Sequence, residues 1–299
     1  MTNLNWSGIF PAMLTPFHEN GDLDLEMLAI NIEAQLAAGS EGLILAGTLG
    51  EASVLTTDEK FELLTYTLGV VNGRCPVLLN VAENTTRDAV AFAQKAEKLV
   101  ATGLMVLPPM RYRADDVEVV TYFRTVAQST SLPILIYNNP VDYGIYITLD
   151  MFEELLQEPN IQAVKESTRD LTNITRLRNR FGDRLKILGG VDTIFLESLV
   201  VGADGTVAGL VDAFPRETFA IFDAFRKGDI KKAVDIYRWF MPLLELDIQP
   251  KLVQYIKLAA TKEGLSTPYT RAPRLPLEGE EEKRIHKIID DAVASRPQI

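Results

Sequence analysis

The strongest constraint on the fold is an alternation of short apolar runs with longer amphipathic segments, which persists along most of the chain. Eight runs rich in Val, Ile and Leu are short and continuous, as is typical of strands buried on both faces of a parallel sheet. We predict strands at Gly8–Leu14, Gly42–Ala46, Val77–Val81, Leu104–Leu107, Pro133–Tyr137, Ile161–Lys165, Lys186–Gly189 and Gly205–Ala208.

The segments between these runs have helical spacing. Apolar residues recur every three or four positions, as in Leu25, Leu28, Ile32 and Leu36. Threonines followed by acidic residues, at Thr56 and Thr85, are typical of helix N-caps. Strand and helix therefore alternate in sequence.

Eight such units predict a (β/α)₈ TIM barrel, which needs about 250 residues. The competing open doubly wound sheet usually carries G-x-G-x-x-G or a phosphate-binding loop, and the sequence contains neither. We expect the barrel in residues 1–228 and a helical extension packed on it in residues 229–299, as one structural domain. The last helices are predicted at Pro215–Arg226, Ile230–Leu246, Pro250–Lys262 and Gly279–Ala294.

Composition excludes several classes of function. The 41 acidic residues outnumber the 30 basic ones and give a net charge of -11, which argues against a nucleic-acid partner. No export signal and no long apolar run is present, so we predict a cytoplasmic protein with no membrane partner. Cys75 is the only cysteine, and His18 and His286 are the only histidines. We interpret His18 as a loop residue and expect neither a metal nor another cofactor.

Lys165 is the first candidate catalytic residue. In a barrel the chemistry lies at the carboxyl ends of the strands, and Lys165 ends the sixth predicted strand. It shares a strand face with Ala163, so if Ala163 faces the barrel interior, Lys165 does too. Burial would favour the neutral amine, which attacks carbonyl and imine carbons. The structural alternative is a lysine that covers apolar surface or pairs with Glu166 or Glu51.

Tyr137 ends the fifth predicted strand, which should lie beside the sixth at a spacing of about 4.8 Å. Its phenol would then reach Lys165 or a covalent adduct and exchange protons with it. The alternative is an ordinary core tyrosine with a backbone partner.

Two glycine-containing loops follow other strands. Gly47-Thr48-Leu49-Gly50-Glu51 would let backbone N–H groups bind a carboxylate, with the Thr48 hydroxyl beside them. Gly189-Gly190-Val191-Asp192 would bring backbone close to a ligand, with Asp192 as a polar contact or as a helix cap. Tight turns also use glycine, so each loop has a purely structural alternative.

Taken together, these residues resemble the dihydrodipicolinate synthase and N-acetylneuraminate lyase superfamily of lysine-dependent barrel enzymes. The resemblance runs from Gly8 to Leu277. The segment 47–51 matches the family's G-[ST]-[TNL]-G-E, Tyr137-Asn138-Asn139-Pro140 its Y-N-x-P, and Val164-Lys165-Glu166 its Schiff-base lysine.

The resemblance implies that Lys165 forms the Schiff base, Tyr137 shuttles protons, and Thr48 acts with the Leu49 amide at the substrate carboxylate. It also implies a homo-oligomer, a tetramer or a dimer. The substrate would be a small anionic 2-oxo or 2-imino acid, contacted by Gly47, Leu49, Asn139, Gly190, Asp192 and Gly209.

Several positions depart from the superfamily's best-known activities. Met110 stands where the synthases carry a second relay tyrosine, which leaves the role of Tyr112 open, and Asp142 stands where they carry an arginine for a dicarboxylic substrate. Gly209 replaces a serine of the neuraminate lyases, and their acidic pair is reduced to Asp192-Thr193. Both activities are therefore disfavoured.

The sequence most resembles the branch of 1-pyrroline-4-hydroxy-2-carboxylate deaminases, which release ammonia and 2,5-dioxopentanoate. The resemblance lies in the Phe-Pro-Ala start, G-T-L-G-E, Leu-Pro-Pro-Met, Y-N-N-P and the segment 237–244. The alternatives are an aldolase or dehydratase of 2-keto-3-deoxy sugar acids, then the synthase or the neuraminate lyase. A metal-dependent barrel aldolase and a non-catalytic scaffold are the remaining ones.

Overall fold

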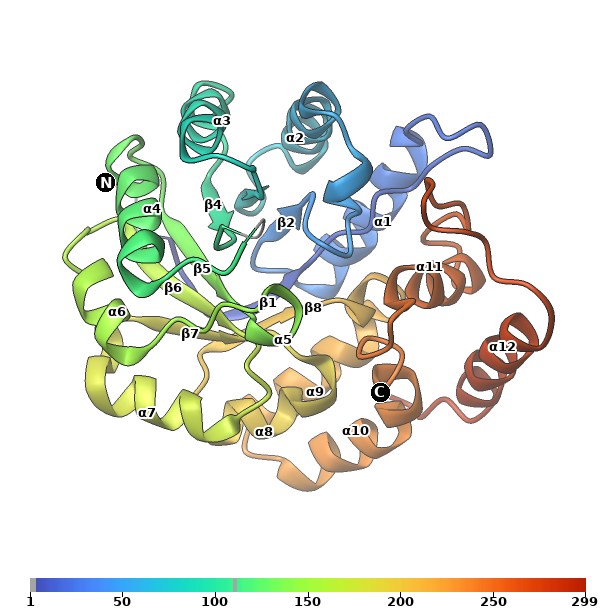
Figure 1. Ribbon diagram of the computed structural model, residues 1–299. Coiled ribbons are helices and arrows are strands. Elements are labelled where there is room, and N and C mark those ends of the chain that lie inside the picture. Colours follow the sequence, from blue (N-terminus) through green and yellow to red (C-terminus); the bar gives the residue numbers. More distant parts are fainter. Residues whose placement is uncertain (1–3, 110–111) are drawn as a thin grey trace.

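The computed structural model describes residues 4–109 and 112–299. Eight parallel strands alternate with helices and form a nearly closed ring, so the predicted (β/α)₈ barrel with C-terminal helices is confirmed (Figure 1). The strands are β1 (Gly8–Pro11), β2 (Leu43–Leu45), β3 (Val77–Val81), β4 (Gly103–Val106), β5 (Ile134–Asn138), β6 (Ile161–Glu166), β7 (Lys186–Gly189) and β8 (Gly205–Ala208).

The ring closes between its first two strands. Hydrogen-bonded neighbours follow the order β1-β8-β7-β6-β5-β4-β3-β2, and a parallel bridge between Ala12 and Ile44 joins β1 to β2. All carboxyl ends therefore meet at one mouth of the barrel, where the fold places its chemistry.

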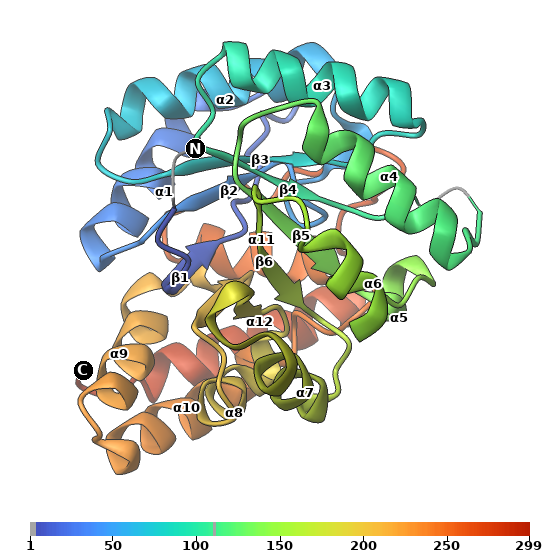
Figure 2. The same ribbon diagram turned by 90° about the vertical axis from the view of Figure 1, so that its left-hand side faces the viewer.

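The helices lie outside the strands, and α9 to α12 gather on one side of the barrel (Figures 1 and 2). Thr56 and Thr85 cap α2 and α3 as predicted, each accepting a backbone N–H with its side chain. None of the helices in the described residues has the length and apolar character needed to cross a membrane. Their bounds are α1 (Leu25–Ala38), α2 (Thr57–Val71), α3 (Thr86–Lys98), α4 (Asp116–Gln128), α5 (Pro140–Tyr143), α6 (Leu149–Leu155), α7 (Leu171–Phe181), α8 (Phe195–Val200), α9 (Pro215–Arg226), α10 (Ile230–Leu244), α11 (Leu252–Lys262) and α12 (Gly279–Ala294).

Three predicted boundaries are wrong by two or three residues. β1 ends at Pro11 and not at Leu14, because the Leu14 N–H donates to the Asp212 side chain at 2.9 Å instead of joining the ladder. α10 ends at Leu244 and α11 begins at Leu252, so the connecting segment is longer than predicted. A turn occupies part of it, in which the Asp247 N–H donates to the Leu244 carbonyl at 3.1 Å.

Side chains of alternate strand residues fill the barrel. Leu135, Tyr137 and Ala163 belong to one buried cluster inside the ring. Val164, which lies between Ala163 and Lys165, packs instead in the layer that includes the outer helices. The two-residue period of β6 therefore directs Lys165 into the barrel, on the same side as Ala163.

Candidate active site

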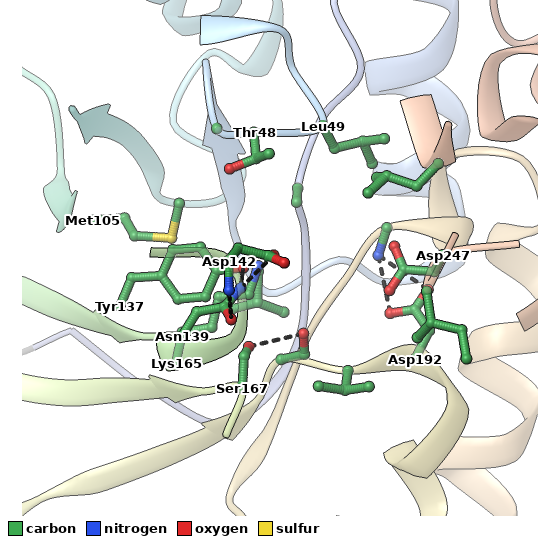
Figure 3. Close-up of a pocket in the computed structure, with 18 of the residues that line it drawn as sticks. Thr48, Leu49, Met105, Tyr137, Asn139, Asp142, Lys165, Ser167, Asp192 and Asp247 are labelled. Atoms are coloured by element: carbon green, nitrogen blue, oxygen red, sulfur yellow. Dashed lines mark hydrogen bonds between the residues drawn. The ribbon is translucent and has the colours of Figure 1, made fainter. Parts of the chain in front are cut away.

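A pocket opens at the carboxyl ends of the strands, and the residues predicted for the site line it (Figure 3). Tyr137, Asn139 and Asp142 lie on one side, Asp192 and Asp247 on the opposite side, and Thr48 and Leu49 along a third edge. All nine site residues predicted from the sequence line this pocket: Gly47, Thr48, Leu49, Tyr137, Asn139, Lys165, Gly190, Asp192 and Gly209.

Lys165 and Tyr137 lie side by side. They are paired residues of neighbouring strands, and the lysine Nζ lies 4.2 Å from the centre of the tyrosine ring. Lys165 is 7% exposed and Tyr137 is 6% exposed. The structure therefore confirms that Lys165 points into the barrel and that it lies close to the phenol of Tyr137.

One form of the structural alternative for Lys165, an ion pair with Glu166 or Glu51, is not found in the described residues, because both carboxylates have other partners. Glu51 pairs with Lys257 at 2.6 Å. The Glu166 carboxylate accepts hydrogen bonds from Asn138 and Asn173 at 3.1 and 3.0 Å. Burial lowers the pKa of Lys165, while Tyr143 and nearby carboxylates oppose that shift. The result is an amine with an increased neutral fraction that lines a pocket at the barrel mouth.

A small hydrogen-bonded group holds the phenol of Tyr137. Its oxygen accepts a hydrogen bond from the Asn139 amide at 3.1 Å, and the same amide donates to Asp142 at 2.7 Å. Burial raises the pKa of Tyr137, so the phenol keeps its proton at neutral pH. It can give that proton to a leaving oxygen and then take one from carbon.

The loop that follows β2 presents backbone donors. The Glu51 N–H donates to the Thr48 carbonyl and the Ala52 N–H to the Gly47 carbonyl, both at 3.1 Å. In the described part of the chain, no protein acceptor takes the N–H groups of Thr48 and Leu49. Unpartnered amides beside a lysine suit a substrate carboxylate, which accepts such bonds strongly.

Glycines make room for two of the polar side chains. A Cβ atom on Gly190 would lie 2.7 Å from Cγ of Lys165, and one on Gly209 would lie 2.8 Å from Oδ1 of Asp247. The Gly209 N–H also donates to both carboxylate oxygens of Asp192, at 3.1 and 3.2 Å. At both of these predicted loop positions, therefore, close packing leaves room only for glycine.

Four polar residues of the site escaped the sequence analysis. Tyr143, in α5, shares a hydrogen bond with the Thr48 hydroxyl and contacts the Tyr137 ring edge-on, with ring centres 5.5 Å apart. Ser167 follows Lys165 on the same strand face and donates to the Gly190 carbonyl at 2.9 Å. Arg169 and Asp247 also line the pocket. The strand period would have identified Ser167, whereas Asp247 comes from the helical extension and carries no local signal.

Other candidates lie away from the pocket. His18 has a side chain that is 57% exposed and lies 3.5 Å from Asp24. Tyr112 is 57% exposed. Met110, which replaces the expected relay tyrosine, lies outside the described residues. Within the described ranges, no group of His, Cys, Asp and Glu is arranged to hold a metal ion.

Comparisons with known proteins find similarity over nearly the whole length of the chain. The model of the dihydrodipicolinate synthetase family matches residues 5–292. A 4-hydroxy-tetrahydrodipicolinate synthase of Streptococcus mutans is 34% identical over 284 residues, which cover 94% of this chain and 96% of that protein. One from Halalkalibacterium halodurans is 29% identical and covers 96% and 97%.

Solved structures agree with this comparison. The dihydrodipicolinate synthase of Aquifex aeolicus superposes with a TM-score of 0.90 at 28% identity, over 95% of this chain and 97% of that one. A dihydrodipicolinate synthase of Bacillus anthracis superposes with a TM-score of 0.93 at 26% identity, over 99% and 100%.

Proposed function

This chain belongs to the dihydrodipicolinate synthetase family and is a Schiff-base lyase of that superfamily, and we propose that Lys165 is the residue that forms the imine. The proposal is carried by one observation: Lys165 is a buried amine that has no ion pair within residues 4–109 and 112–299, in contact with a buried phenol, at the mouth of the barrel. The substrate is a small 2-oxo or cyclic 2-imino acid. Its carboxylate binds the amides of Thr48 and Leu49.

Within the superfamily we propose the 1-pyrroline-4-hydroxy-2-carboxylate deaminase reaction. The neutral amine of Lys165 adds to C2 of the cyclic imine, and the C2–N bond of the ring breaks to leave a lysine iminium and a free amino group on C5. The iminium makes the C3 proton acidic. Tyr137 transfers that proton, and the C4 hydroxyl leaves as water.

The remaining steps release the products. Proton shifts convert the conjugated iminium into an enamine at C4 and C5 and then into an imine at C5. Water hydrolyses this imine to an aldehyde and ammonia, and a second water frees Lys165. The balance is one pyrroline plus one net water to one 2,5-dioxopentanoate plus one ammonia. Tyr143, hydrogen-bonded to Thr48, is the second phenol available to these proton transfers.

The charge of the pocket supports a substrate with one carboxylate. Asp142, Asp192 and Asp247 line it, whereas Lys165 and Arg169 are its cationic residues. Asp142 also stands where the synthases are expected to carry an arginine. A second carboxylate on the substrate would meet acidic side chains there in place of the expected arginine, which disfavours a dicarboxylic substrate.

The second candidate is 4-hydroxy-tetrahydrodipicolinate synthase. It is favoured by the names of the relatives, since the similar proteins from Streptococcus mutans and Halalkalibacterium halodurans both carry that name. The same lysine and phenol would then act on pyruvate and an aldehyde.

Product analysis separates the candidates. The purified protein is incubated with the hydroxylated pyrroline carboxylate, with pyruvate plus aspartate semialdehyde, and with ketodeoxy sugar acids. The deaminase releases ammonia and 2,5-dioxopentanoate from the first substrate only. Consumption of pyruvate with the semialdehyde identifies the synthase, and release of pyruvate from a sugar acid identifies an aldolase. Either of these without ammonia would refute the deaminase assignment.

We also propose that the chain assembles as a homo-oligomer, a tetramer or a dimer. Light scattering coupled to gel filtration measures the mass directly. A monomer of 33.2 kDa at micromolar concentration would refute this proposal.

A further inference from the structure

Asp247 brings an acidic side chain into the pocket from outside the barrel. It lies in the turn between α10 and α11, in the C-terminal extension, and reaches the pocket beside β8 (Figures 1 and 3). The approach depends on Gly209, where a Cβ atom would lie 2.8 Å from Oδ1 of Asp247. The extension therefore contributes to the pocket as well as to packing.

The three aspartates of the pocket differ in how well their oxygens are already hydrogen-bonded. Asp192 accepts the backbone N–H groups of Gly209 and Leu210, the latter at 2.7 Å. Asp142 accepts the Asn139 amide at 2.7 Å. In the described part of the chain, Asp247 accepts only the backbone N–H of Asp192, and no side chain donates to it.

Asp247 is half-buried, and a carboxyl group that is partly removed from water is costly unless a ligand or water donates hydrogen bonds to its free acceptor positions. Burial, and the neighbouring Asp192 carboxylate, raise the pKa of Asp247 well above its usual range. Asp247 lines the same pocket as Lys165 and Tyr137, on the side opposite to them (Figure 3).

We infer that Asp247 is a specificity-determining residue, which binds a hydrogen-bond donor on the part of the substrate that extends beyond the imine carbon. The donor is a hydroxyl or an N–H group. This inference rests on the proposed function, because it assumes that the substrate is attached to Lys165. It adds to that function a reason for preferring hydroxylated substrates over apolar ones of the same length.

The location of the carboxyl defines which atoms of a substrate it can contact. The substrate carboxylate binds at the Thr48–Leu49 edge, and its C2 forms the imine with Lys165. The remaining carbon atoms of the substrate therefore extend across the pocket, toward the side that holds Asp192 and Asp247 (Figure 3). A three-carbon acid such as pyruvate ends at C3, so it has no further carbon atom that could reach that side. A five-carbon acid has two more, C4 and C5.

A matched pair of probes tests the inference. 2-Oxopentanoate and 4-hydroxy-2-oxopentanoate have the same length and differ in one hydroxyl. Each is titrated against the protein in the presence of borohydride, and mass spectrometry of the Lys165 peptide measures every adduct that the probe leaves. The readout is the ratio of the two half-saturating concentrations, with pyruvate as a third probe that does not reach Asp247.

We expect the wild-type protein to prefer the hydroxylated probe by about 3- to 10-fold, since a hydrogen bond between uncharged groups contributes about 0.5–1.5 kcal/mol net. Asp247→Ala should bring the ratio close to one while pyruvate still labels Lys165, which also shows that the variant folds. Asp247→Asn keeps an oxygen acceptor and should retain part of the preference.

The outcomes separate the two proposals. A wild-type ratio near one, or a ratio that Asp247→Ala leaves unchanged, overturns the inference about Asp247. An equal loss for all three probes in Asp247→Ala assigns the residue to structure and overturns it as well. If no probe labels Lys165 in the wild-type protein, the Schiff-base function itself fails, and the inference fails with it.

Discussion

Three lysines in the described residues are buried, Lys60, Lys165 and Lys257, and Lys165 is the one among them that has no carboxylate in an ion pair there. Lys257, in α11, is 0% exposed and lies 2.6 Å from Glu51, and its Nζ lies 4.4 Å from the centre of the Phe17 ring. Lys165 is 7% exposed, and its Nζ lies 4.2 Å from the centre of the Tyr137 ring. Both amines therefore rest against an aromatic face.

The difference lies in what else surrounds each amine. Lys257 also donates to the Tyr269 carbonyl at 2.6 Å, so its surroundings are filled by protein. Burial lowers the pKa of Lys257 to about 8, and Glu51 opposes the shift. Lys165 has an open pocket and a phenol instead of a bonded carboxylate. Burial alone therefore does not identify a reactive lysine; burial without an ion pair, next to a cavity, is the more specific sign.

The largest expected effect comes from Lys165→Met. Removal of the amine eliminates the covalent step, so we expect kcat to fall by at least about a thousandfold. The free energy of unfolding should stay the same or rise, because a buried polar group is replaced by an apolar one of similar length. Steady-state rates and urea unfolding measure the two quantities. A variant with substantial activity would contradict the assignment of Lys165.

Tyr137→Phe tests the phenol beside the reactive lysine. Loss of a general acid and base is expected to lower kcat by about 10²- to 10⁴-fold. Trapping of pyruvate on Lys165 should persist, since the amine is retained. Rapid-quench kinetics with borohydride separate imine formation from turnover, and a variant that turns over normally would exclude Tyr137 from proton transfer.

Lys257→Met makes the complementary test on the structural lysine. It leaves Glu51 buried without its partner, so we expect the free energy of unfolding to fall by about 3–5 kcal/mol. The double variant Lys257→Met with Glu51→Gln removes both charges and should recover much of that loss. Chemical denaturation measures all three proteins, and an unchanged stability of the single variant would show that the pair is not structural.

The pH dependence sharpens the comparison further. Imine formation needs the neutral amine, and burial lowers the pKa of Lys165. The rate of pyruvate trapping should therefore rise with pH and level off below the ordinary lysine pKa of about 10.4. A midpoint at or above that value would show that the amine is not desolvated.

Tyr143→Phe has the smallest expected effect. It removes the hydrogen bond to the Thr48 hydroxyl but leaves Lys165 and Tyr137 in place. We expect kcat to decrease by about 10-fold, with little change in the affinity for pyruvate, if the second phenol assists proton transfer. A change in affinity alone would assign Tyr143 to the shape of the carboxylate-binding loop.

The fold and one half of the site were predictable because they follow local rules. The strand period directs Lys165 inward, and sequential barrel units place Tyr137 beside it. Glycine at position 190 marks a close approach of backbone to a side chain. These features depend on neighbours in sequence or on adjacent strands.

The other half depends on long-range packing. Asp247 lies about 80 residues after Lys165 and reaches the pocket only because α10 and α11 fold back over the barrel. The partner of Glu51 is likewise Lys257, and no local pattern connects the two. The predicted end of β1 at Leu14 was also wrong, because the Leu14 N–H donates to the Asp212 side chain and not to a neighbouring strand.

The most direct test of the central claim compares Lys165 with the buried Lys257 in one experiment. The intact protein is treated with pyruvate and borohydride at neutral pH, digested, and its peptides are weighed. We predict that the peptide containing Lys165 gains the mass of the reduced adduct and that the peptide containing Lys257 gains none. An adduct on Lys257, or an unlabelled Lys165, would contradict the account.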